Sequence, residues 1–514
     1  MDLTNAFFAQ KTELPKDLVP PTLKAMPEKV LQFGEGNFLR AFVDWMIERM
    51  NRQGCFNGRA VVVQPIEQGL VDTLNAQDGL FTLILRGLSD GRIVESKEII
   101  SSISRGLNPY TQWSQFLQCA ENPDLRIVVS NTTEAGIAFN DEAFTPDQTQ
   151  VSFPAKLAAF LYRRFTHFQA DPRKGLLIFP CELIDKNGSN LRSIVLRLAK
   201  QWQMPDDFVD WVQEHNHFFN TLVDRIVTGY PKDDMKSFNR EWGYRDRLVD
   251  TGEIFHLWVI EGDKRFQTEL PLADIGLNVI WTDDLKPYRE RKVRVLNGAH
   301  TMSFATAFLC GLDSVKAAVE DNAVGRFMRR GIFEEILPVL PMPEQEKRMF
   351  AEGVLERFQN PFIHHKWMDI ALNSVSKFKT RCLPSIIDYA AEKGTAPSLL
   401  SFSLAALMVF YRGTQWEEGR LQAKRPQDDY LVSDDLQVLN FFYDAWSDLD
   451  PADGSALESM VKRVLARTPF WGIDLNTLPG LASRVTQSIQ TILTDGMPAA
   501  LARLLEETER HRDR

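Results

Sequence analysis

The first half of the chain alternates short apolar, β-branched runs with stretches in which apolar residues recur about every 3.6 positions. Because helical stretches separate the runs, we expect parallel strands joined by crossover helices. The predicted strands are residues 29–33 (KVLQF), 58–65 (GRAVVVQP), 126–130 (RIVVS) and 175–180 (GLLIFP), with 277–281 (LNVIW) as a late strand of the same sheet.

The stretch after the first predicted strand has a clear helical pattern. Its apolar stripe repeats near the 3.6-residue period and consists of Phe38, Phe42, Trp45 and Met46. A strand, a short glycine-containing turn and an amphipathic helix therefore form the first structural unit of the chain.

The pattern changes after about residue 285. Long amphipathic stretches such as 322–337 and 397–411 dominate there, and convincing strand runs almost vanish. We therefore predict an α/β domain over residues 1–285 and a mainly helical domain over residues 286–514. A chain of 514 residues is also too long for one compact core.

Charge and hydropathy exclude two classes of partner. The 59 Lys and Arg against 69 Asp and Glu give a formal net charge of −10, which argues against binding of a nucleic-acid backbone. The longest apolar stretch, residues 399–411, falls well short of the roughly 20 residues that span a bilayer. We expect a buried helix there, and no membrane partner. The sequence leaves the oligomeric state open.

The cysteines predict neither a disulfide framework nor a structural zinc site. They are five in number, widely spaced and without a CxxC motif, at Cys55, Cys119, Cys181, Cys310 and Cys382. The first 30 residues lack the basic and apolar regions of a signal peptide. We therefore expect reduced thiols in a cytoplasmic protein that uses no metal.

A glycine turn joins the first predicted strand to its helix. Glycines at this place let the backbone approach a pyrophosphate, while the helix start supplies N–H groups and a positive dipole end. The match is partial because Leu39 stands where the usual fingerprint has a third glycine, so a plain strand-to-helix turn remains the alternative. The predicted dinucleotide-binding residues are Phe33, Gly34, Gly36, Asn37 and Phe38.

Two other strand ends carry polar side chains. Gln64 ends the second strand and can bond a ribose 2′-hydroxyl, but it does not repel a 2′-phosphate as a carboxylate would. NAD is therefore favoured over NADP without NADP being excluded. Asn131 follows the third strand, at the edge where parallel sheets bind ligands. The alternative for Asn131 is that it merely closes a βα loop.

Lys292, Asn297 and His300 form a polar cluster on a predicted helix over residues 288–304. At about 100° per residue, Lys292 and His300 are roughly 80° apart and Asn297 lies about 60° further. All three can therefore face one cleft. On spacing alone the alternative is a solvated lysine, a local helix irregularity and a satisfied core histidine.

The same three residue types suit reduction of a carbonyl group and its reverse. Such a reaction needs a group that moves the alcohol proton and donors that hold the developing alkoxide. Lysine can serve as the acid and base, asparagine as the donor, and histidine can orient a substrate hydroxyl. A nucleotide-binding protein without turnover would not need this cluster, and clustered His and carboxylates of a metal hydrolase are not apparent.

Further polar residues are candidates for the reacting site and for binding the substrate. Asn187 follows the fourth strand and could offer a second amide to the reacting oxygen, although Asn-Gly is also an ordinary turn. The segments 357–361 and 376–381 bring cations into the helical domain, among them Lys377 and Arg381. A sugar acid needs a cation for its carboxylate, whereas the alternative is a solvated charge run.

Six segments carry a resemblance to a known family that extends over nearly the whole chain. On these residues the sequence resembles the polyol-specific long-chain dehydrogenases of the mannitol dehydrogenase family. The segments are QFGEGNFLRAFVDW (32–45), SNTTEAGI (130–137), PCELIDKNG (180–188), TLVDRIVTGYP (221–231), KPYRERKVRVLNGAH (286–300) and RFQNP (357–361).

The resemblance implies a Rossmann-type, NAD-binding N-terminal domain, a helical C-terminal domain and metal-independent catalysis between them. It implies that Lys292 is the general acid and base and that Asn297 and Asn187 stabilise the oxyanion. It also implies that His300 and Lys377 contact the substrate and that Asp224 lies near the nicotinamide.

Three departures from the family pattern bear on the substrate. The family's Cys-Asp-Asn is Cys181-Glu182-Leu183 here, and Asp369 replaces an arginine that contacts the polyol. Arg289 replaces an acid three residues before the lysine, which disfavours a proton relay through Glu290. The first two departures disfavour mannitol and fructose as substrates. The residue-level likeness favours reduction of D-tagaturonate to D-altronate in hexuronate catabolism, and D-fructuronate or another polyol remains the alternative.

Overall fold

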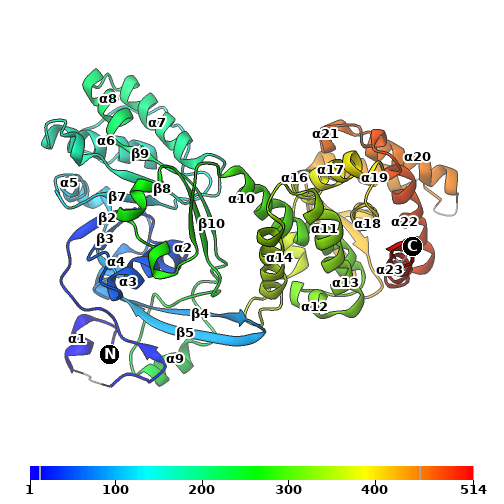
Figure 1. The fold of residues 1–514 in the computed structure, drawn as a ribbon, viewed down its shortest axis with the longest axis horizontal. Helices are drawn as coiled ribbons and strands as arrows, with labels where there is room; N and C mark the ends of the chain where they lie inside the picture. Colours follow the sequence, from blue (N-terminus) through cyan, green and yellow to red (C-terminus); the bar gives the residue numbers. More distant parts are fainter. Residues whose placement is uncertain (11–12, 448, 451–452, 513–514) are drawn as a thin grey trace. The chain divides into compact units, whose positions relative to one another are not determined.

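In the computed structural model the chain forms two compact units, and the structure describes residues 1–10, 13–447, 449–450 and 453–512 (Figure 1). The first unit comprises Met1–Gly87 and Arg92–Leu285, and the second comprises Leu88–Gly91 and Lys286–Arg514. The predicted fold class, an α/β part followed by a mainly helical part, is confirmed. The sequence did not predict that Leu88–Gly91, the tip of a hairpin, would group with the second unit.

A six-stranded parallel sheet forms the centre of the first unit, with the order β6-β3-β2-β7-β8-β9. Counted along the chain this order is 3-2-1-4-5-6, which is typical of dinucleotide-binding sheets. Four of its strands are the ones that the sequence predicted. The strands are β2 (Glu28–Phe33), β3 (Arg59–Val63), β6 (Ile103–Leu107), β7 (Ile127–Ser130), β8 (Leu177–Pro180) and β9 (His217–Phe218).

Alternate residues of these strands enter two different cores, because successive side chains of a strand point to opposite faces. In β2, Val30 packs into one core and Leu31 into the other. The first core is completed by α2 (Asn37–Leu39), η1 (Arg40–Asp44) and α3 (Trp45–Arg52). The second is completed by α5 (Pro109–Cys119), α6 (Phe153–His167), α7 (Asn187–Gln201) and α8 (Asp206–His215).

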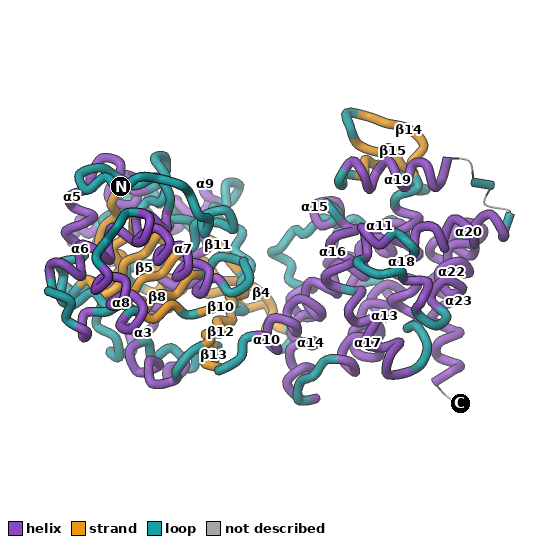
Figure 2. The backbone as a smooth tube through the Cα atoms, turned by 90° about the horizontal axis from the view of Figure 1, so that it is seen from above, coloured by secondary structure: helices purple, strands orange, loops and turns teal. Residues whose placement is uncertain are grey.

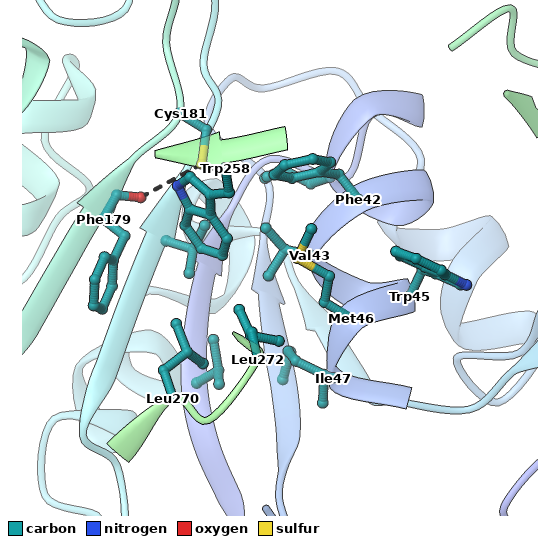
Figure 3. Close-up of a cluster of buried hydrophobic side chains, with 14 of the residues drawn as sticks. Phe42, Val43, Trp45, Met46, Ile47, Phe179, Cys181, Trp258, Leu270 and Leu272 are labelled. Carbon is teal, nitrogen blue, oxygen red and sulfur yellow. Dashed lines mark hydrogen bonds between the residues drawn. The ribbon is translucent and has the colours of Figure 1, made fainter. Parts of the chain in front are cut away.

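The predicted late strand belongs to a different sheet, which corrects that prediction. β13 (Val279–Thr282) pairs with β12 (Leu257–Glu261), and β12 pairs with β10 (Asn220–Asp224). Phe179 of β8 meets Trp258 of this small sheet at 5.8 Å, and Phe42 meets the same ring at 5.6 Å (Figure 3). An apolar run reveals a buried strand but not its partner, so the pattern could not assign the sheet.

A further four-stranded sheet completes the first unit, with the order β1-β5-β4-β11. Its long central strands are joined at Asp90 and Gly91, whose φ angles of 53° and 70° fit a two-residue type I′ turn. The strands are β1 (Leu18–Val19), β4 (Phe81–Ser89), β5 (Arg92–Ile100) and β11 (Asp250–Gly252), accompanied by α1 (Asn5–Gln10) and α9 (Met235–Trp242). The helix α4 (Val71–Ala76) packs on β6 of the six-stranded sheet. Short 3-10 turns are η2 (Pro172–Lys174), η3 (Lys264–Glu269) and η4 (Ala273–Ile275).

The second unit begins with one long helical run and packs around a buried helix, α18 (Ser398–Phe410) (Figure 2). Every residue from 399 to 410 is buried, as predicted. In the part of the chain that the structure describes, no helix is both long and apolar enough to cross a membrane. The run is α10 (Lys286–Arg291), η5 (Lys292–Asn297) and α11 (Gly298–Leu309).

The remaining helices surround this centre. They are α12 (Val315–Glu320), α13 (Asn322–Arg330), η6 (Gly331–Ile336), η7 (Leu337–Val339), α14 (Glu344–Phe358), α15 (Trp367–Ile370), α16 (Ser374–Arg381), α17 (Leu383–Lys393), α19 (Leu436–Ser447), α20 (Gly454–Leu465), α21 (Thr468–Trp471), η8 (Leu475–Thr477), α22 (Leu481–Asp495) and α23 (Met497–Arg512). Of these, α22 packs directly against α18.

A three-stranded antiparallel sheet interrupts the helices, although the sequence predicted almost no strands here. Its strands are β14 (Gly413–Glu417), β15 (Arg420–Lys424) and β16 (Asp429–Val432). One face holds buried residues such as Leu421 and Val432, while most of β14 is exposed. Short strands rich in charged residues give little hydrophobic signal, so the pattern did not reveal them.

Glu335 of η6 caps the start of α18. The backbone N–H groups of Leu399 and Leu400 donate to its two carboxylate oxygens, each at 2.8 Å. The first N–H groups of a helix have no partner within the helix, so a buried helix start needs such an acceptor. Glu335 itself is buried, so water cannot easily replace it.

We predict that Glu335→Ala lowers the free energy of unfolding by about 2 kcal/mol, because two buried N–H groups lose their acceptor. The matched control is Glu334→Ala, which removes an ion pair of a half-exposed carboxylate with Arg330 at 3.0 Å and should cost less than about 1 kcal/mol. Urea unfolding followed by tryptophan fluorescence measures both. Equal losses in the two variants would contradict the capping role.

Candidate functional site

The glycine turn lies where the strand order of the main sheet reverses, between β2 and β7. The N–H of Gly34 donates to the carbonyl of Val63 at 3.0 Å, and the N–H of Asn131 donates to Phe33 at 3.0 Å. Gly34 has a φ of +117°, and a Cβ on it would lie 2.9 Å from the carbonyl oxygen of Asn131. Position 34 therefore requires glycine for its backbone angle and for the close approach.

The start of α2 offers an open place for an anion. No atom lies within 4 Å of the position that a Cβ on Gly36 would take, and no described side chain caps this helix start. Its first N–H groups and the positive dipole end suit a phosphate. The side chain of buried Leu39 would lie 3.4 Å from a Cβ on Gly34. The residues present therefore fit a dinucleotide, with leucine in place of the third glycine.

The other predicted turn residues, Phe33, Asn37 and Phe38, lie around the start of α2. The Asn37 Oδ1 accepts from Arg40 at 2.5 Å, and the ring of Phe38 stacks on Phe42 at 5.0 Å. The side chain of Phe33 is fully buried beside Phe153. Phe33 can therefore offer a ligand only its backbone, whereas Asn37 and Phe38 lie in the first helical turn.

The side chain of Gln64, the predicted partner of a ribose hydroxyl, is bonded to the loop that follows β3. Its side chain is 3% exposed, and its amide nitrogen donates to the carbonyls of Ile66 and Glu67 at 2.9 and 2.7 Å. The amide thus orders the loop after β3, and its contact with a ribose stays a prediction. The sequence placed Gln64 correctly at a strand end, but nearby carbonyl groups compete successfully for its amide.

Glu182 binds the loop after β7, a role that the sequence did not predict. The sequence showed it only as a departure from the family motif. Its carboxylate accepts from Ser130 Oγ at 3.0 Å and from the N–H and hydroxyl of Thr132, both at 2.9 Å. Burial raises the pKa of this carboxyl. The Asn131 amide donates to the Cys181 carbonyl at 2.9 Å. Together these bonds tie the ends of β7 and β8 beside the glycine turn.

Asn187, the predicted second amide donor for the reacting oxygen, is bonded to backbone in this structure. It is 1% exposed, and its Nδ2 donates to the carbonyls of Pro180, Glu182 and Thr221 at 3.0 to 3.1 Å. Its Oδ1 accepts from the N–H groups of Gly188 and Thr221 at 2.9 and 2.8 Å. The amide is fully engaged with backbone, so in this geometry it has no donor left for a reacting oxygen.

Asp224 ends β10 and is buried. The next residue, Arg225, donates to the carbonyl of Ala41 in η1 and packs over the ring of Trp45 at 4.2 Å. Burial lowers the pKa of Arg225 to about 9. These contacts fasten the end of β10 to the helix that follows the glycine turn, which places Asp224 next to that anchor.

In the second unit, Lys292 and Asn297 are the first and last residues of a π-helical segment, η5. Hydrogen bonds of a π-helix join residues five apart, and such segments are frequent at functional sites. An α-helix would set these two residues about 140° apart, whereas the wider turn brings positions i and i+5 close to alignment. The predicted uniform α-helix is thus wrong in detail, because the segment from Lys292 to Asn297 is π-helical.

His300 lies one turn further, on α11, as a neutral ring. Its Nδ1 lies 3.0 Å from the carbonyl of Leu296, which can only accept, so Nδ1 carries the hydrogen. Its Nε2 is buried and has no hydrogen-bond partner among the described residues. Burial, followed by the field of nearby His365, lowers the pKa of His300 to about 3. Nε2 is therefore a free acceptor.

The two predicted substrate-binding cations on α16 have different hydrogen-bond partners. The Lys377 ammonium donates to the carbonyl of Ile370 at 2.9 Å, and burial together with Arg381 lowers its pKa. Arg381 donates to Thr301 Oγ1 on α11 at 3.3 Å. The Cys382 thiol donates to the carbonyl of Gly298 at 3.6 Å, so the end of α16 packs on the start of α11.

These two sets of residues can perform complementary chemistry. The first unit offers an open helix start for a phosphate group. The second offers an ammonium, an amide and a neutral imidazole, which can move a proton and hold an oxyanion. Among the residues that the structure describes, no three His, Cys, Asp or Glu side chains gather in a way that could hold a metal ion.

Comparison with known proteins identifies relatives along the whole chain. The mannitol dehydrogenase Rossmann domain matches residues 28–274, and the mannitol dehydrogenase C-terminal domain matches residues 284–493. An altronate oxidoreductase of Halalkalibacterium halodurans is 45% identical over 483 residues, which cover 94% of each chain. One of Yersinia pestis is 45% identical over 480 residues, covering 93% of this chain and 97% of the relative.

Solved structures agree on the fold. D-sorbitol dehydrogenase in substrate-free form has a TM-score of 0.79 and 21% identity, covering 98% of this chain and 100% of the other. Pseudomonas fluorescens mannitol 2-dehydrogenase, in a ternary complex with NAD and D-mannitol, has a TM-score of 0.67 and 22% identity at the same coverage. From the family domains and the 45% identical relatives, the chain belongs to the mannitol dehydrogenase family.

Proposed function

We propose that this protein is an NAD-dependent oxidoreductase that reduces D-tagaturonate to D-altronate and catalyses the reverse oxidation in hexuronate catabolism. The substrate assignment rests on the 45% identity to altronate oxidoreductases over more than nine tenths of the chain. The cluster of Lys292, Asn297 and His300 supports the same type of reaction, because it combines a proton donor with an oxyanion donor.

The glycine turn would hold the cofactor. Gly34, Gly36 and the N–H groups of Asn37 and Phe38 would bind the pyrophosphate, because this backbone is open and uncapped. Asn131 and Asp224 would support the cofactor from the neighbouring strand ends. When bound, the nicotinamide supplies the hydride for reduction and accepts it in the oxidation. NAD is also the cofactor in the related mannitol 2-dehydrogenase complex.

The second unit would move the proton. Lys292 Nζ gives a proton to the substrate oxygen as the carbonyl becomes an alcohol, and takes it back in the oxidation. Asn297 donates an amide hydrogen to the same oxygen while its negative charge develops. His300 accepts a hydrogen bond from a substrate hydroxyl at Nε2. Lys377 would contact the substrate. Asn187 acts in this scheme as a positioning residue for the β8–α7 turn.

We place the reaction in the cytoplasm. All five cysteines are free in the structure, including exposed Cys55. Free thiols suit a reducing compartment, since oxidising compartments favour disulfides. The relatives with altronate oxidoreductase names are bacterial proteins, which fits a metabolic enzyme acting on a small sugar acid.

The first test compares substrates. NADH absorbance should fall fastest with D-tagaturonate, with kcat/KM at least about tenfold above D-fructuronate and far above D-fructose, because a site that bonds substrate hydroxyls discriminates between epimers by a few kcal/mol. Faster turnover of fructuronate would replace the proposed substrate by its epimer. Turnover of fructose alone would contradict a sugar-acid substrate.

The second test removes the proposed acid and base. Lys292→Met should lower kcat about 1,000-fold, in the range of general acid–base catalysis, and leave NADH binding by fluorescence within about twofold. The matched control is Lys286→Met on the adjoining helix α10, whose side chain is 78% exposed. The control should keep near wild-type activity. A Lys292→Met variant with full turnover would exclude this role.

The third test concerns the neutral state of His300. Its pKa in the folded protein, about 3, lies below that of an unfolded histidine because of burial and the fields of His365, Arg357 and Arg381. As pH falls below about 6.5, His300 therefore binds a proton in the unfolded chain but not in the folded protein. The folded state loses free energy of unfolding over this pH range.

Between pH 7 and pH 5 the wild type should therefore lose on the order of 2 kcal/mol more unfolding free energy than His300→Asn. Urea titrations at several pH values measure this difference. His364→Asn, at the neighbouring exposed position, is the control and should follow the wild type. Parallel pH curves for the wild type and His300→Asn would show that His300 titrates normally.

A further inference from the structure

Arg381 is a partly buried cation without an anionic partner among the residues that the structure describes. Among the described residues it donates one hydrogen bond, to Thr301 Oγ1 at 3.3 Å, and forms no ion pair with a carboxylate. A guanidinium has five N–H donors, and keeping a charge away from water is costly unless it is paired. The remaining donors therefore favour an anionic ligand at this place.

The two lysines of α16 have other contacts than Arg381. Lys377 donates its ammonium to the carbonyl of Ile370 at 2.9 Å. Lys379 lies beside Gly472 after α21, where a Cβ on the glycine would be 3.3 Å from the lysine Cε. Of the three cations on this helix, Arg381 is the one bonded to α11, the helix that carries His300.

The position of Thr301 relates Arg381 to the reacting groups. Thr301 follows Asn297 by four residues, so the two lie on the same side of α11 with a rise of about 6 Å between them. Lys292 lies one π-helical turn before Asn297. Lysine, amide and the arginine-bonded threonine thus follow one another along one side of a continuous helical run.

The spacing matches a keto uronate. In an open-chain six-carbon keto uronate, four C–C bonds separate the carbonyl carbon from the carboxylate carbon, or about 5 Å in extended form. With the carbonyl oxygen at Lys292 and Asn297, the carboxylate would reach the level of Thr301. A guanidinium fork suits a carboxylate, because it can donate two parallel hydrogen bonds.

We propose that Arg381 binds the substrate carboxylate and is the residue that selects sugar acids over neutral polyols and ketoses. This inference rests on the proposed function, since it needs a substrate with a carboxylate. A neutral sugar would leave the guanidinium without its anion and would be bound more weakly for that reason.

The test uses the full-length protein with Arg381→Met, Arg381→Lys and the matched control Lys379→Met. Arg381→Met should raise KM for D-tagaturonate about 100-fold with a smaller change in kcat, because a charge-assisted bidentate contact is lost far from the reacting carbon. Arg381→Lys should raise KM about tenfold, since lysine keeps the charge but not the fork. Lys379→Met should leave KM unchanged.

A second measurement is independent of turnover. Calorimetry of D-altronate binding to the NADH-saturated protein should show a similar loss of affinity in Arg381→Met, about 100-fold. Binding of the neutral alditol altritol should stay the same in wild type and variant. An altritol affinity that falls equally with that of altronate would mean that Arg381 only supports the shape of the site.

The possible failures can be told apart. A wild type that oxidises no NADH with any keto uronate overturns the proposed function itself. A wild type that is active, with unchanged KM and altronate affinity in Arg381→Met, overturns only the assignment of Arg381. If Arg381→Met does not fold, Arg381→Lys decides, and an unchanged KM in that variant overturns the assignment.

Discussion

The backbone of Gly34 passes so close to Asn131 that a Cβ would lie 2.9 Å from its carbonyl oxygen. This close approach is possible because β2 and β7 run parallel and end at the same edge, and it leaves the start of α2 open above the turn. Sheet order, turn conformation and helix start therefore depend on one another. A side chain at position 34 would separate the two strand ends on which the nucleotide site relies.

Buried charged groups hold this arrangement by bonding to backbone. Glu182 accepts from Thr132 just after β7, and Arg225 donates to Ala41 in η1, near the glycine turn. A buried charge gains little over a well-packed apolar side chain, but each of these bonds fixes a particular loop. Within the first unit, polar side chains thus fix the positions of the loops. The two apolar faces of the sheet supply most of the stability.

The sequence predicted those features that depend on local pattern. Strands buried on both faces stand out as apolar runs, so β2, β3, β7 and β8 could be predicted, whereas the polar strands β14 to β16 could not. Spacing and the family resemblance together predict roles for the lysine, amide and histidine, whereas the π-helical turn depends on hydrogen bonds that spacing does not encode. For Gln64 and Asn187 the position was predictable, but not which nearby carbonyls would bind the amide.

The π-helical turn between Lys292 and Asn297 also has an evolutionary consequence. Such a turn holds one more residue than an α-helical turn, and losing that residue would rotate everything after it by about 100° relative to the lysine. Selection should therefore act on the length of this segment more strictly than on the apolar side chains within it. Substitutions among those side chains would be tolerated in descendants of this chain, while a single-codon deletion there would be removed.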